Sequence, residues 1–403
     1  MDVLQEALER IKPSKDEVER IFSIVDAFIA ELNSRLKGAR AIVGGSLAKG
    51  SFLRDIHDAD IYVQFDPKHD SEEISGMLEK VLDDHEKLHG SRDYFQVKRD
   101  GLILEIIPII RIEDAKQARN ITDISPLHVE WVRKSALNDD MRLAKAFAKA
   151  QRVYGAESYI QGFSGYALEI LVVYYGGFLK LLENAKDWKK PVVIDVEKQH
   201  EDVFKELNIS KLNSPLILID PVEAGRNATA ALSDEKFDIF VKRAKEFLDS
   251  PSVDLFSKKE YSVEDIDPGD DHLIVVDVET ERSKVDVVGC RILKVFEYIR
   301  NNLKTRDFNV IDCGWKFDKK TKGTLWYVVE NKELSPIITW RGPPVSAESD
   351  AEKFRQKYDD IFEDKGRLYA RVERKYKEPF SLVKDLFCAE VITDRVKSIQ
   401  LRS

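Results

Sequence analysis

Residues 44–63 of the chain read GGSLAKGSFLRDIHDADIYV and decide its fold. The β-branched run at residues 41–43 comes directly before them and predicts a short strand. Gly44 and Gly45 then let the backbone turn tightly and approach a ligand closely. Ser46 and the amides after it stand where a helix begins, and the unpaired N–H groups of a helix start bind phosphate.

Asp58 and Asp60 lie two residues apart in a predicted strand, so their carboxylates project from the same face. Carboxylates that share a site repel one another unless a positive charge lies between them. Hard oxygen ligands suit Mg²⁺, which also binds substrate phosphates. The competing interpretation is a surface turn that carries two solvated aspartates.

Glu105 is a third carboxylate and lies inside the apolar run at residues 102–109. A buried charge without a partner is costly, so an acid at this place needs a reason. The alternative is a strand-edge acid that faces solvent. The three acids together suit a two-metal phosphoryl-transfer site, in which both metals hold an in-line displacement.

The glycine-rich turn is not a P-loop. That motif needs a glycine, four residues and then Gly-Lys-Ser/Thr. Gly45 and Gly50 have that separation, but Ser51 follows Gly50 directly and Lys49 comes before it. Gly-Ser, then Asp-x-Asp, then a distant third acid instead resembles the nucleotidyltransferase fold of DNA polymerase β and its relatives.

Short strings further along the chain make this resemblance more specific. They are Tyr-Gly-Ala-Glu at 154–157, Gly-Phe-Ser-Gly-Tyr at 162–166 and Asp-Pro-Val-Glu at 220–223, followed by Arg226 and Asn227. In this order and spacing they resemble the archaeal, class I CCA-adding enzymes, the tRNA nucleotidyltransferases that build the 3′ CCA end. The resemblance covers residues 1 to about 250 well and the remainder weakly.

The resemblance implies an α+β multidomain protein. A polymerase β-like nucleotidyltransferase head, a mixed sheet with helices, would span residues 1–115, and a mainly helical neck that binds nucleotide and tRNA would span 116–250. An RRM-like α+β body with a tail, which holds the tRNA acceptor stem and TΨC arm, would span 251–403. The chain ends sooner after Tyr376 than this family leads us to expect, which points to a reduced tail or final helix.

The composition is that of a globular protein larger than one hydrophobic core supports, with 403 residues. Its net charge of −9 argues mildly against an RNA partner, although such binding depends on local lysine and arginine patches. The sequence has no apolar run of about eighteen residues and no signal peptide, so we expect a cytoplasmic protein without a membrane span.

Cys290, Cys313 and Cys388 are widely spaced and are expected to be core thiols. A monomer and a homodimer are both compatible with the sequence.

Local patterns predict most of the remaining elements. Pro13 and a capping box from Ser14 to Glu17 separate two helices within residues 1–37. Residues 71–89 are expected to form one charged amphipathic helix. The other predicted elements are helices at 138–151, 164–185, 234–248, 285–301 and 351–362, strands at 95–98, 102–107, 272–278, 326–330, 337–340 and 367–376, and turns at 100–101 and 341–344.

The resemblance also implies roles for residues of the catalytic strands. Asp58 and Asp60 would bind metal, and Glu105 matches the family's third carboxylate, which is normally an aspartate one methylene shorter. Glu105 would activate the RNA 3′-hydroxyl as a general base or through the metal. Ser46 and Lys49 would contact the triphosphate. Lys49 stands where the family often has arginine and lacks its bidentate fork, and a solvated loop lysine is the competing account.

A nucleotide pocket is implied by five further residues. His128 matches a pocket histidine, and Arg142, Lys145 and Tyr154 match the phosphate and ribose side of the pocket. Arg226 matches an arginine that helps to read the incoming base. Packed side chains and a solvated helix face explain the same residues without a ligand.

Two aromatic groups have more than one interpretation. The aromatic residues at 162–166 are expected to pack at a helix start rather than to stack on bases. Basic residues interleaved with tryptophans suit contact with the RNA backbone, and a solvated hairpin tip explains them equally well. These basic residues are Lys316, Lys319, Lys320 and Lys322, close to Trp315 and Trp326.

We therefore expect an enzyme that transfers CMP twice and AMP once from CTP and ATP to the 3′ end of tRNA. It would release pyrophosphate, use two Mg²⁺ ions and need no nucleic-acid template. A poly(A) polymerase or oligoadenylate-type enzyme that uses ATP alone is one alternative. A tRNA-binding protein that has lost catalysis is the other.

Overall fold

The computed structural model describes residues 2–54, 56–257 and 263–402, and the chain forms two compact units, residues 1–259 and 260–403. The first unit holds two large hydrophobic cores, one at its sheet and one among its helices. The second unit has a core of its own. The predicted boundary at residue 115 lies inside the first unit and stays a prediction.

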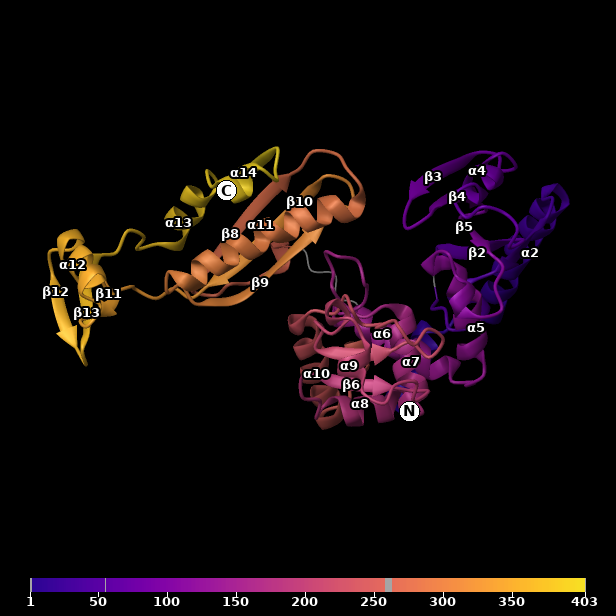
Figure 1. Cartoon of the computed structure of the whole chain (residues 1–403), viewed down its shortest axis with the longest axis horizontal. Coiled ribbons are helices and arrows are strands. Elements are labelled where there is room, and N and C mark those ends of the chain that lie inside the picture. The colour runs from indigo at the N-terminus through magenta and orange to yellow at the C-terminus, as the bar shows by residue number, and fades with distance from the viewer. Residues whose placement is uncertain (1, 55, 258–262, 403) are drawn as a thin grey trace. The chain divides into compact units, whose positions relative to one another are not determined.

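A five-stranded mixed sheet with the order β1-β2-β5-β4-β3 lies in the first unit (Figure 1). β2 and β5 run parallel, and the other neighbouring strands are antiparallel. The strands predicted at the ends of the 44–63 stretch and around Glu105 are therefore confirmed. The five strands are β1 (Ala39–Val43), β2 (Asp58–Phe65), β3 (His85–His89), β4 (Asp93–Arg99) and β5 (Leu102–Ile110).

Two helices precede the sheet, as predicted: α1 (Val3–Ile11) and α2 (Lys15–Arg35). The side chain of Ser14 accepts a hydrogen bond from the backbone N–H of Glu17 and so caps α2. The apolar stripe of α2 packs against the buried side chains of β2 and β5. One face of the sheet is thereby closed by hydrophobic contacts.

The helix predicted over residues 71–89 is wrong. The structure has a short α4 (Ile74–Glu79) and then the strand β3, which pairs with β4. The backbone turns at Asp84, which has a φ of 42°, so the helix cannot continue. The hairpin predicted at Asp100 and Gly101 is confirmed, since both residues have positive φ.

The helix predicted over residues 164–185 is broken in two. Gly176 and Gly177 have φ values of 75° and 134°, and α7 (Gly165–Tyr175) and α8 (Phe178–Ala185) meet there at 90°. Among the described residues no single helix is long and apolar enough to cross a membrane, and this bent pair passes that test only when both helices are counted together. α7 and α8 lie in the helical core of the first unit.

The remaining elements of the first unit are mostly helical, and one core among them contains a cluster of phenylalanines that includes Phe147, Phe163, Phe178 and Phe240. A small parallel pair of strands, β6 and β7, was not predicted. These elements are α3 (Gly45–Lys49), η1 (Ala115–Gln117), η2 (Ile121–Ile124), α5 (Ser125–Arg133), α6 (Asn138–Ala150), β6 (Val192–Asp195), α9 (Val203–Glu206), η3 (Ile209–Lys211), β7 (Leu216–Ile219), α10 (Asp234–Asp249) and η4 (Val253–Phe256).

The second unit contains a four-stranded sheet with the order β14-β8-β10-β9 and a three-stranded sheet with the order β11-β13-β12. The long helix α11 contributes side chains to the core with the first of these sheets. After Tyr376 the chain forms two short helices and then β14, which pairs with β8. The elements are η5 (Val263–Asp265), β8 (His272–Glu279), α11 (Val285–Thr305), β9 (Val310–Phe317), β10 (Lys322–Val329), β11 (Ile337–Pro344), α12 (Glu348–Lys357), β12 (Ile361–Asp364), β13 (Arg367–Glu373), α13 (Pro379–Leu386), α14 (Glu390–Thr393) and β14 (Ser398–Leu401).

The turn predicted at residues 341–344 is wrong, because this segment is the end of β11. β11 is an edge strand, and its register with β13 shifts between Arg341 and Pro344. Proline has no N–H to donate and is tolerated in edge strands and at such irregularities. The helix predicted over 351–362 ends at Lys357, and β12 begins at Ile361.

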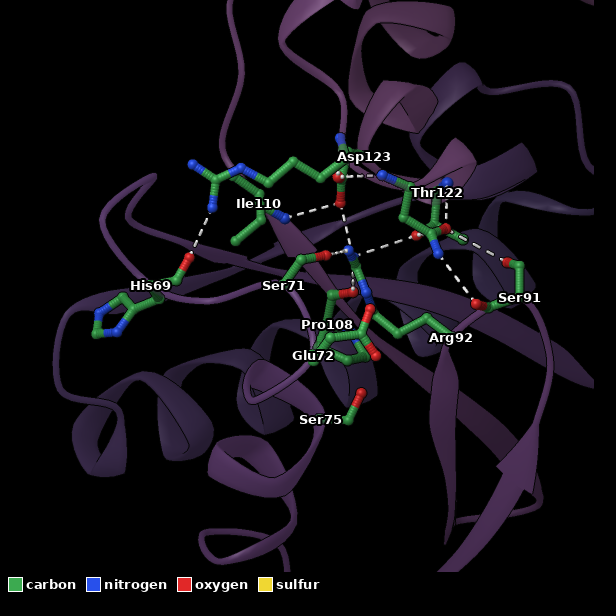
Figure 2. A network of polar contacts seen from close by, with 12 residues as sticks. His69, Ser71, Glu72, Ser75, Ser91, Arg92, Pro108, Ile110, Thr122 and Asp123 are labelled. Atoms are coloured by element: carbon green, nitrogen blue, oxygen red, sulfur yellow. Dashed lines mark hydrogen bonds and ion pairs between the residues drawn. The ribbon is translucent and has the colours of Figure 1, made fainter.

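A buried ion pair connects the sheet to η2 in the first unit (Figure 2). Arg92 donates to Asp123 Oδ1 over 2.6 Å and to the carbonyl of Pro108 over 2.9 Å. Asp123 also accepts from the N–H groups of Ile110, Arg119 and Asn120. Both side chains of the pair are almost fully buried, so each charge depends on the other. Since η2 leads directly into α5, this network fixes the start of α5 to the end of β5.

We expect Asp123→Asn to lower the free energy of unfolding of the first unit by about 3–5 kcal/mol, because it leaves the charge of Arg92 buried without a counter-ion. Urea unfolding followed by circular dichroism measures this. Lys205→Met is the matched control, since Lys205 is 82% exposed in its pair with Asp202 and such pairs contribute about 0–1 kcal/mol. Equal losses in both variants would refute a structural role for the buried pair.

Candidate active site

The three predicted acids lie on one face of the sheet. Along β2, Ala59 and Ile61 are buried in the core, so Asp58 and Asp60 project from the opposite face. Asp60 lies directly beside Glu105 in the parallel register of β2 and β5. Gln96 of β4 is the neighbour of Glu105 on its other side and donates from Nε2 to Glu105 Oε1 over 2.7 Å. Strand pairing thus brings Glu105, which is distant in the sequence, to the face that carries Asp58 and Asp60.

The acids of this cluster disfavour one another's charge. Burial, followed by the charges of Glu105 and Asp58, raises the pKa of Asp60 from 3.8 to about 7, although Lys49 and Lys145 act in the opposite direction. Burial also raises the pKa of Glu105, and Asp58 adds to this, while the hydrogen bond from Gln96 favours its ionised form. Within the described part of the chain, no three His, Cys, Asp or Glu side chains are arranged so that they could hold a metal ion as they stand.

Neighbouring side chains leave no room for a Cβ atom at Gly44 or Gly45. A Cβ atom on Gly45 would lie 1.7 Å from Asp60 Oδ2, and one on Gly44 would lie 2.5 Å from the ring of Tyr62. Gly45 also has a φ of +54°, which disfavours other residues. The absence of a side chain at Gly45 therefore lets the backbone lie close to the carboxylate of Asp60. Ser46 follows directly in α3.

A second charged cluster is formed around Glu169 of α7, whose side chain is 1% exposed. Glu169 Oε2 accepts from Lys49 Nζ over 2.7 Å. Its Oε1 accepts from Lys145 Nζ and from Ser51 Oγ, each over 2.7 Å. Burial alone would raise the pKa of Glu169, but Lys145 and Lys49 outweigh burial and lower it to about 2.

His128 of α5 belongs to a third cluster. Its ring stacks on Tyr166 with centroids 4.0 Å apart, and Tyr166 donates from its hydroxyl to Asp220 Oδ1 over 3.1 Å. Arg226 donates to Asp220 Oδ2 over 2.6 Å, and Lys49 Nζ lies 4.7 Å from the Tyr166 ring. His128 Nε2 is 3.1 Å from Asp220 Oδ2 but makes no hydrogen bond. Burial lowers the pKa of His128, so the neutral ring is favoured despite the carboxylate.

Arg142 and Tyr154 are enclosed by the chain itself. Arg142 donates to the carbonyls of Phe52 and Gly50 over 2.9 and 2.6 Å and also pairs with Asp139. Burial raises the pKa of Tyr154. Its hydroxyl lies 2.8 Å from where a Cβ of Gly165 would be. Arg142 thus attaches α6 to the turn that follows α3.

The structure brings most of the predicted residues of the first unit into these clusters. Glu169, Tyr166 and Asp220 were not predicted as site residues. An acid within the apolar run 167–173 was the available signal for Glu169. Phe163 is fully buried, as expected for packing at a helix start. The four predicted RNA-binding lysines lie in the second unit, exposed on or between β9 and β10.

A cleft of about 620 Å³ is formed by segments that are close to these clusters in the sequence. The residues that line it are others than those of the clusters. One wall is the segment 114–124, which leads into α5, and the other is formed by Gln199 and residues 222–225, which lead into Arg226. It contains none of the predicted site residues. The contacts of the charged residues, and not this cleft, therefore mark the candidate site.

Three protein-family models match successive parts of the chain. The model described as "Nucleotidyltransferase domain" matches residues 25–128, and "tRNA nucleotidyltransferase, second domain" matches residues 139–257. The model described as "CCA-adding enzyme, C-terminal domain" matches residues 271–396. Together they span both units of the structure.

Curated relatives agree with these matches. A CCA-adding enzyme from Nanoarchaeum equitans is 34% identical over 378 residues, which are 91% of this chain and 92% of that protein. The CCA-adding enzyme of Methanocaldococcus jannaschii is 28% identical over 96% of this chain and 90% of its own length, and that of Saccharolobus islandicus strain M.14.25 is 34% identical over 92% and 88%. A structure of the Cid1 poly(U) polymerase with Mg and 3′-dATP bound has a TM-score of 0.49 at 16% identity and covers 64% of this chain and 98% of its own.

The expected fold class, a polymerase β-like head followed by a helical region and an α+β region, is confirmed. With identities of 34% over nearly the whole length of its relatives, this chain belongs to the archaeal-type CCA-adding enzymes, the tRNA nucleotidyltransferases that add C, C and A to the 3′ end of tRNA.

Proposed function

We propose that Asp58, Asp60 and Glu105 are the catalytic carboxylates of this enzyme and hold two Mg²⁺ ions. The observation that carries the proposal is the parallel register of β2 and β5, which sets Asp60 beside Glu105 with Asp58 on the same face. The substrates are CTP, ATP and a tRNA that lacks its 3′ end. The tRNA 3′-oxygen bonds to the α-phosphorus, and the bond from that phosphorus to the oxygen between the α- and β-phosphates breaks, so that pyrophosphate leaves with this oxygen. The hydroxyl proton passes to Glu105 or to water.

The charge of the acidic cluster supports a cation at this place. Burial and mutual repulsion raise the pKa values of Asp60 and Glu105, so ionising both without a cation is unfavourable. Carboxylate oxygens are the ligands that Mg²⁺ prefers, and the nucleotidyltransferase fold is typically metal-dependent. When bound, the metal would stabilise the negative charge that develops on the phosphoryl oxygens. The chemistry of these carboxylates therefore fits the ion, and their side chains have to rotate to hold it together.

We assign the nucleotide to the residues that surround the carboxylates. Ser46 and Lys49 contact the triphosphate, since α3 carries both and Lys49 lies close enough to Asp60 to affect its charge. The stacked His128 and the side chain of Arg226 receive the base and ribose. Lys145, Tyr154 and Arg142 complete the pocket, and Arg142 acts by holding the turn at Gly50.

The exposed lysines of the second unit are assigned to the tRNA. They lie in β9, in the turn between β9 and β10, and at the start of β10, close in the sequence to one tryptophan of each strand. Cationic and aromatic groups that lie together in this way suit contact with RNA. Contacts of this kind bind the RNA backbone and are independent of its sequence. The residues are Lys316, Lys319, Lys320 and Lys322.

The first test uses a tRNA transcript that ends at the discriminator base. Wild-type protein with CTP alone should add two C residues and stop, and later addition of ATP should add one A. Asp60→Ala should reduce both additions by about a thousandfold or more, because it removes a carboxylate from the reacting centre. The control is Asp249→Ala, an exposed residue at the end of α10. Tailing with ATP alone would contradict the proposed specificity, and full activity of Asp60→Ala would contradict the assigned carboxylates.

The second test uses the charge of Asp60 in the metal-free protein. Because its pKa is raised from 3.8 to about 7, the folded protein keeps a proton that the unfolded chain loses, so stability falls as the pH rises through this window. At pH 8 we expect Asp60→Asn to raise the melting temperature by about 5 °C, at roughly 2–4 °C per kcal/mol for a unit of this size. At pH 4 the difference should disappear.

Differential scanning fluorimetry with and without Mg²⁺ measures both effects. Mg²⁺ should stabilise the wild type at pH 8 but not Asp60→Asn, which lacks the repulsion and one ligand. Asp249→Asn is the control, and its melting temperature should follow that of the wild type at each pH. A wild-type melting temperature that rises between pH 4 and pH 7 as much as that of Asp60→Asn would show that Asp60 carries no raised pKa.

A further inference from the structure

The loop at residues 220–226 carries Asp220 and Arg226 and closes on itself. The N–H of Asp220 donates to the carbonyl of Arg226 over 2.9 Å, and the N–H of Arg226 donates to the carbonyl of Glu223 over 2.9 Å. Inside the loop, Val222 donates from its N–H to Asp220 Oδ1 over 2.9 Å. The side chain of Arg226 is 30% exposed and bonds to Asp220 Oδ2. The place of the Arg226 guanidinium therefore depends on where this loop lies.

Three side chains from the preceding segment hold the loop from outside. Gln199 and Lys211 each donate to one of its carbonyl groups. His200 Nε2 is 2.8 Å from a third carbonyl oxygen, that of Ala224. All three bonds end on the backbone of the loop, so they fix its path. Of the three side chains, histidine is the one whose charge changes between about pH 5 and 8.

The contacts of His200 require a charged ring. Its side chain is 9% exposed, and its Nδ1 is 2.9 Å from Glu206 Oε2 of α9. A backbone carbonyl only accepts hydrogen bonds, so Nε2 carries a hydrogen. Glu206 Oε1 accepts the N–H groups of Glu201 and Asp202. The bond from Asp202, followed by His200, lowers the pKa of Glu206, so this carboxylate is ionised and also only accepts. Nδ1 therefore carries a hydrogen as well, and a ring with two N–H groups is the imidazolium.

We propose that His200 in its charged form is a positioning residue that holds the loop at residues 220–226 and so places Arg226 for the incoming nucleotide. This inference rests on the proposed role of Arg226 and adds the group that controls it. A neutral ring has one N–H group and bonds either to Glu206 or to Ala224. The first tautomer releases the loop, and the second sets a lone pair of the ring against the carboxylate. His200 acts through the loop and does not contact the nucleotide.

The groups around His200 set the pH at which the loop is released. Burial alone would lower the pKa of His200, but the Ala224 carbonyl, Glu206 and Asp195 outweigh burial and raise the pKa from 6.5. Asp195, at the end of β6, also accepts the backbone N–H of His200 over 2.9 Å. The loop is therefore held below pH 6.5 and is released as the pH rises through the raised pKa. Further charged side chains on the adjoining elements are Lys198, Glu201, Asp202, Lys205, Lys211 and Glu223.

The test measures the KM of CTP for addition to a tRNA transcript, with Mg²⁺ and saturating tRNA, from pH 6 to pH 9. The KM of the wild type should rise about fivefold across this range, which is a modest coupling between two sites. His200→Gln has no charge to lose, so it should show the raised KM already at pH 6 and meet the wild type at pH 9. The ratio of the two kcat values should not change with pH, because the acids lie on the sheet and not on the loop. Glu206→Gln should move the midpoint of the rise to lower pH, since it removes the charge that stabilises the imidazolium.

A matched histidine separates this effect from other titrations. His89 Nδ1 is 2.7 Å from Asp93 Oδ1 on the edge strand β3, and its side chain is 58% exposed. His89→Gln should keep the wild-type profile, and circular dichroism shows whether each variant folds. A wild-type KM that does not rise with pH, a His200→Gln profile parallel to that of the wild type, or an unchanged midpoint in Glu206→Gln would each overturn the proposal.

Proton NMR of the imidazole groups measures the protonation of His200 without nucleotide transfer. The signal that His200→Gln removes should titrate above pH 6.5 in the free wild type, and CTP with Mg²⁺ should raise its pKa further, because coupling is reciprocal. Titration below pH 6.5, or no response to CTP, would overturn the proposal. Arg226→Ala separates this failure from that of the proposed site. An unchanged KM of CTP in Arg226→Ala would refute the role of Arg226, whereas a raised KM together with a pH-independent wild type would refute the role of His200 alone.

Discussion

The parallel pairing of β2 with β5 is the constraint on which the active site depends. Side chains alternate along both strands, and the apolar half of each strand is buried in the core. A shift of one residue would turn Asp58, Asp60 and Glu105 into that core and expose the apolar residues instead. Burial of the apolar face therefore determines which face the acids occupy, and the register of the two strands places Asp60 beside Glu105.

Outside the sheet, the buried charges of the first unit are compensated by ion pairs. The acids of the sheet repel one another, whereas Glu169 binds two lysines and Asp220 binds Arg226 beside a stacked histidine. Arg142 and the pair of Arg92 with Asp123 bind no part of these clusters, yet they hold the turns and helix starts that carry them. The site thus has an acidic part on the sheet and basic side chains on α3, α6 and the segment between β7 and α10.

The sequence was informative wherever the decisive interaction is local. Alternation around Asp58 and Asp60, the apolar run around Glu105 and the cap of α2 each follow from neighbours in the chain, and the structure confirms these elements. The predicted helix at 71–89 failed because β3 is stabilised by pairing with β4, which a helical pattern does not reveal. Glu169 was missed for a different reason, because its partners Lys49 and Lys145 are 120 and 24 residues away in the sequence.

Glu105, which we propose as the third carboxylate, is held in place by a neighbour. A glutamate has one more rotatable bond than an aspartate and loses more freedom when its carboxylate is held in one position. Gln96 lies opposite Glu105 in the antiparallel register of β4 and β5 and donates to its Oε1. This bond opposes the effect of burial on the pKa of Glu105 and favours the ionised form, which is the form that binds a cation. Because β4 supplies this donor, the carboxylate of Glu105 is held on the face that Asp58 and Asp60 share, in the geometry that the parallel strands impose.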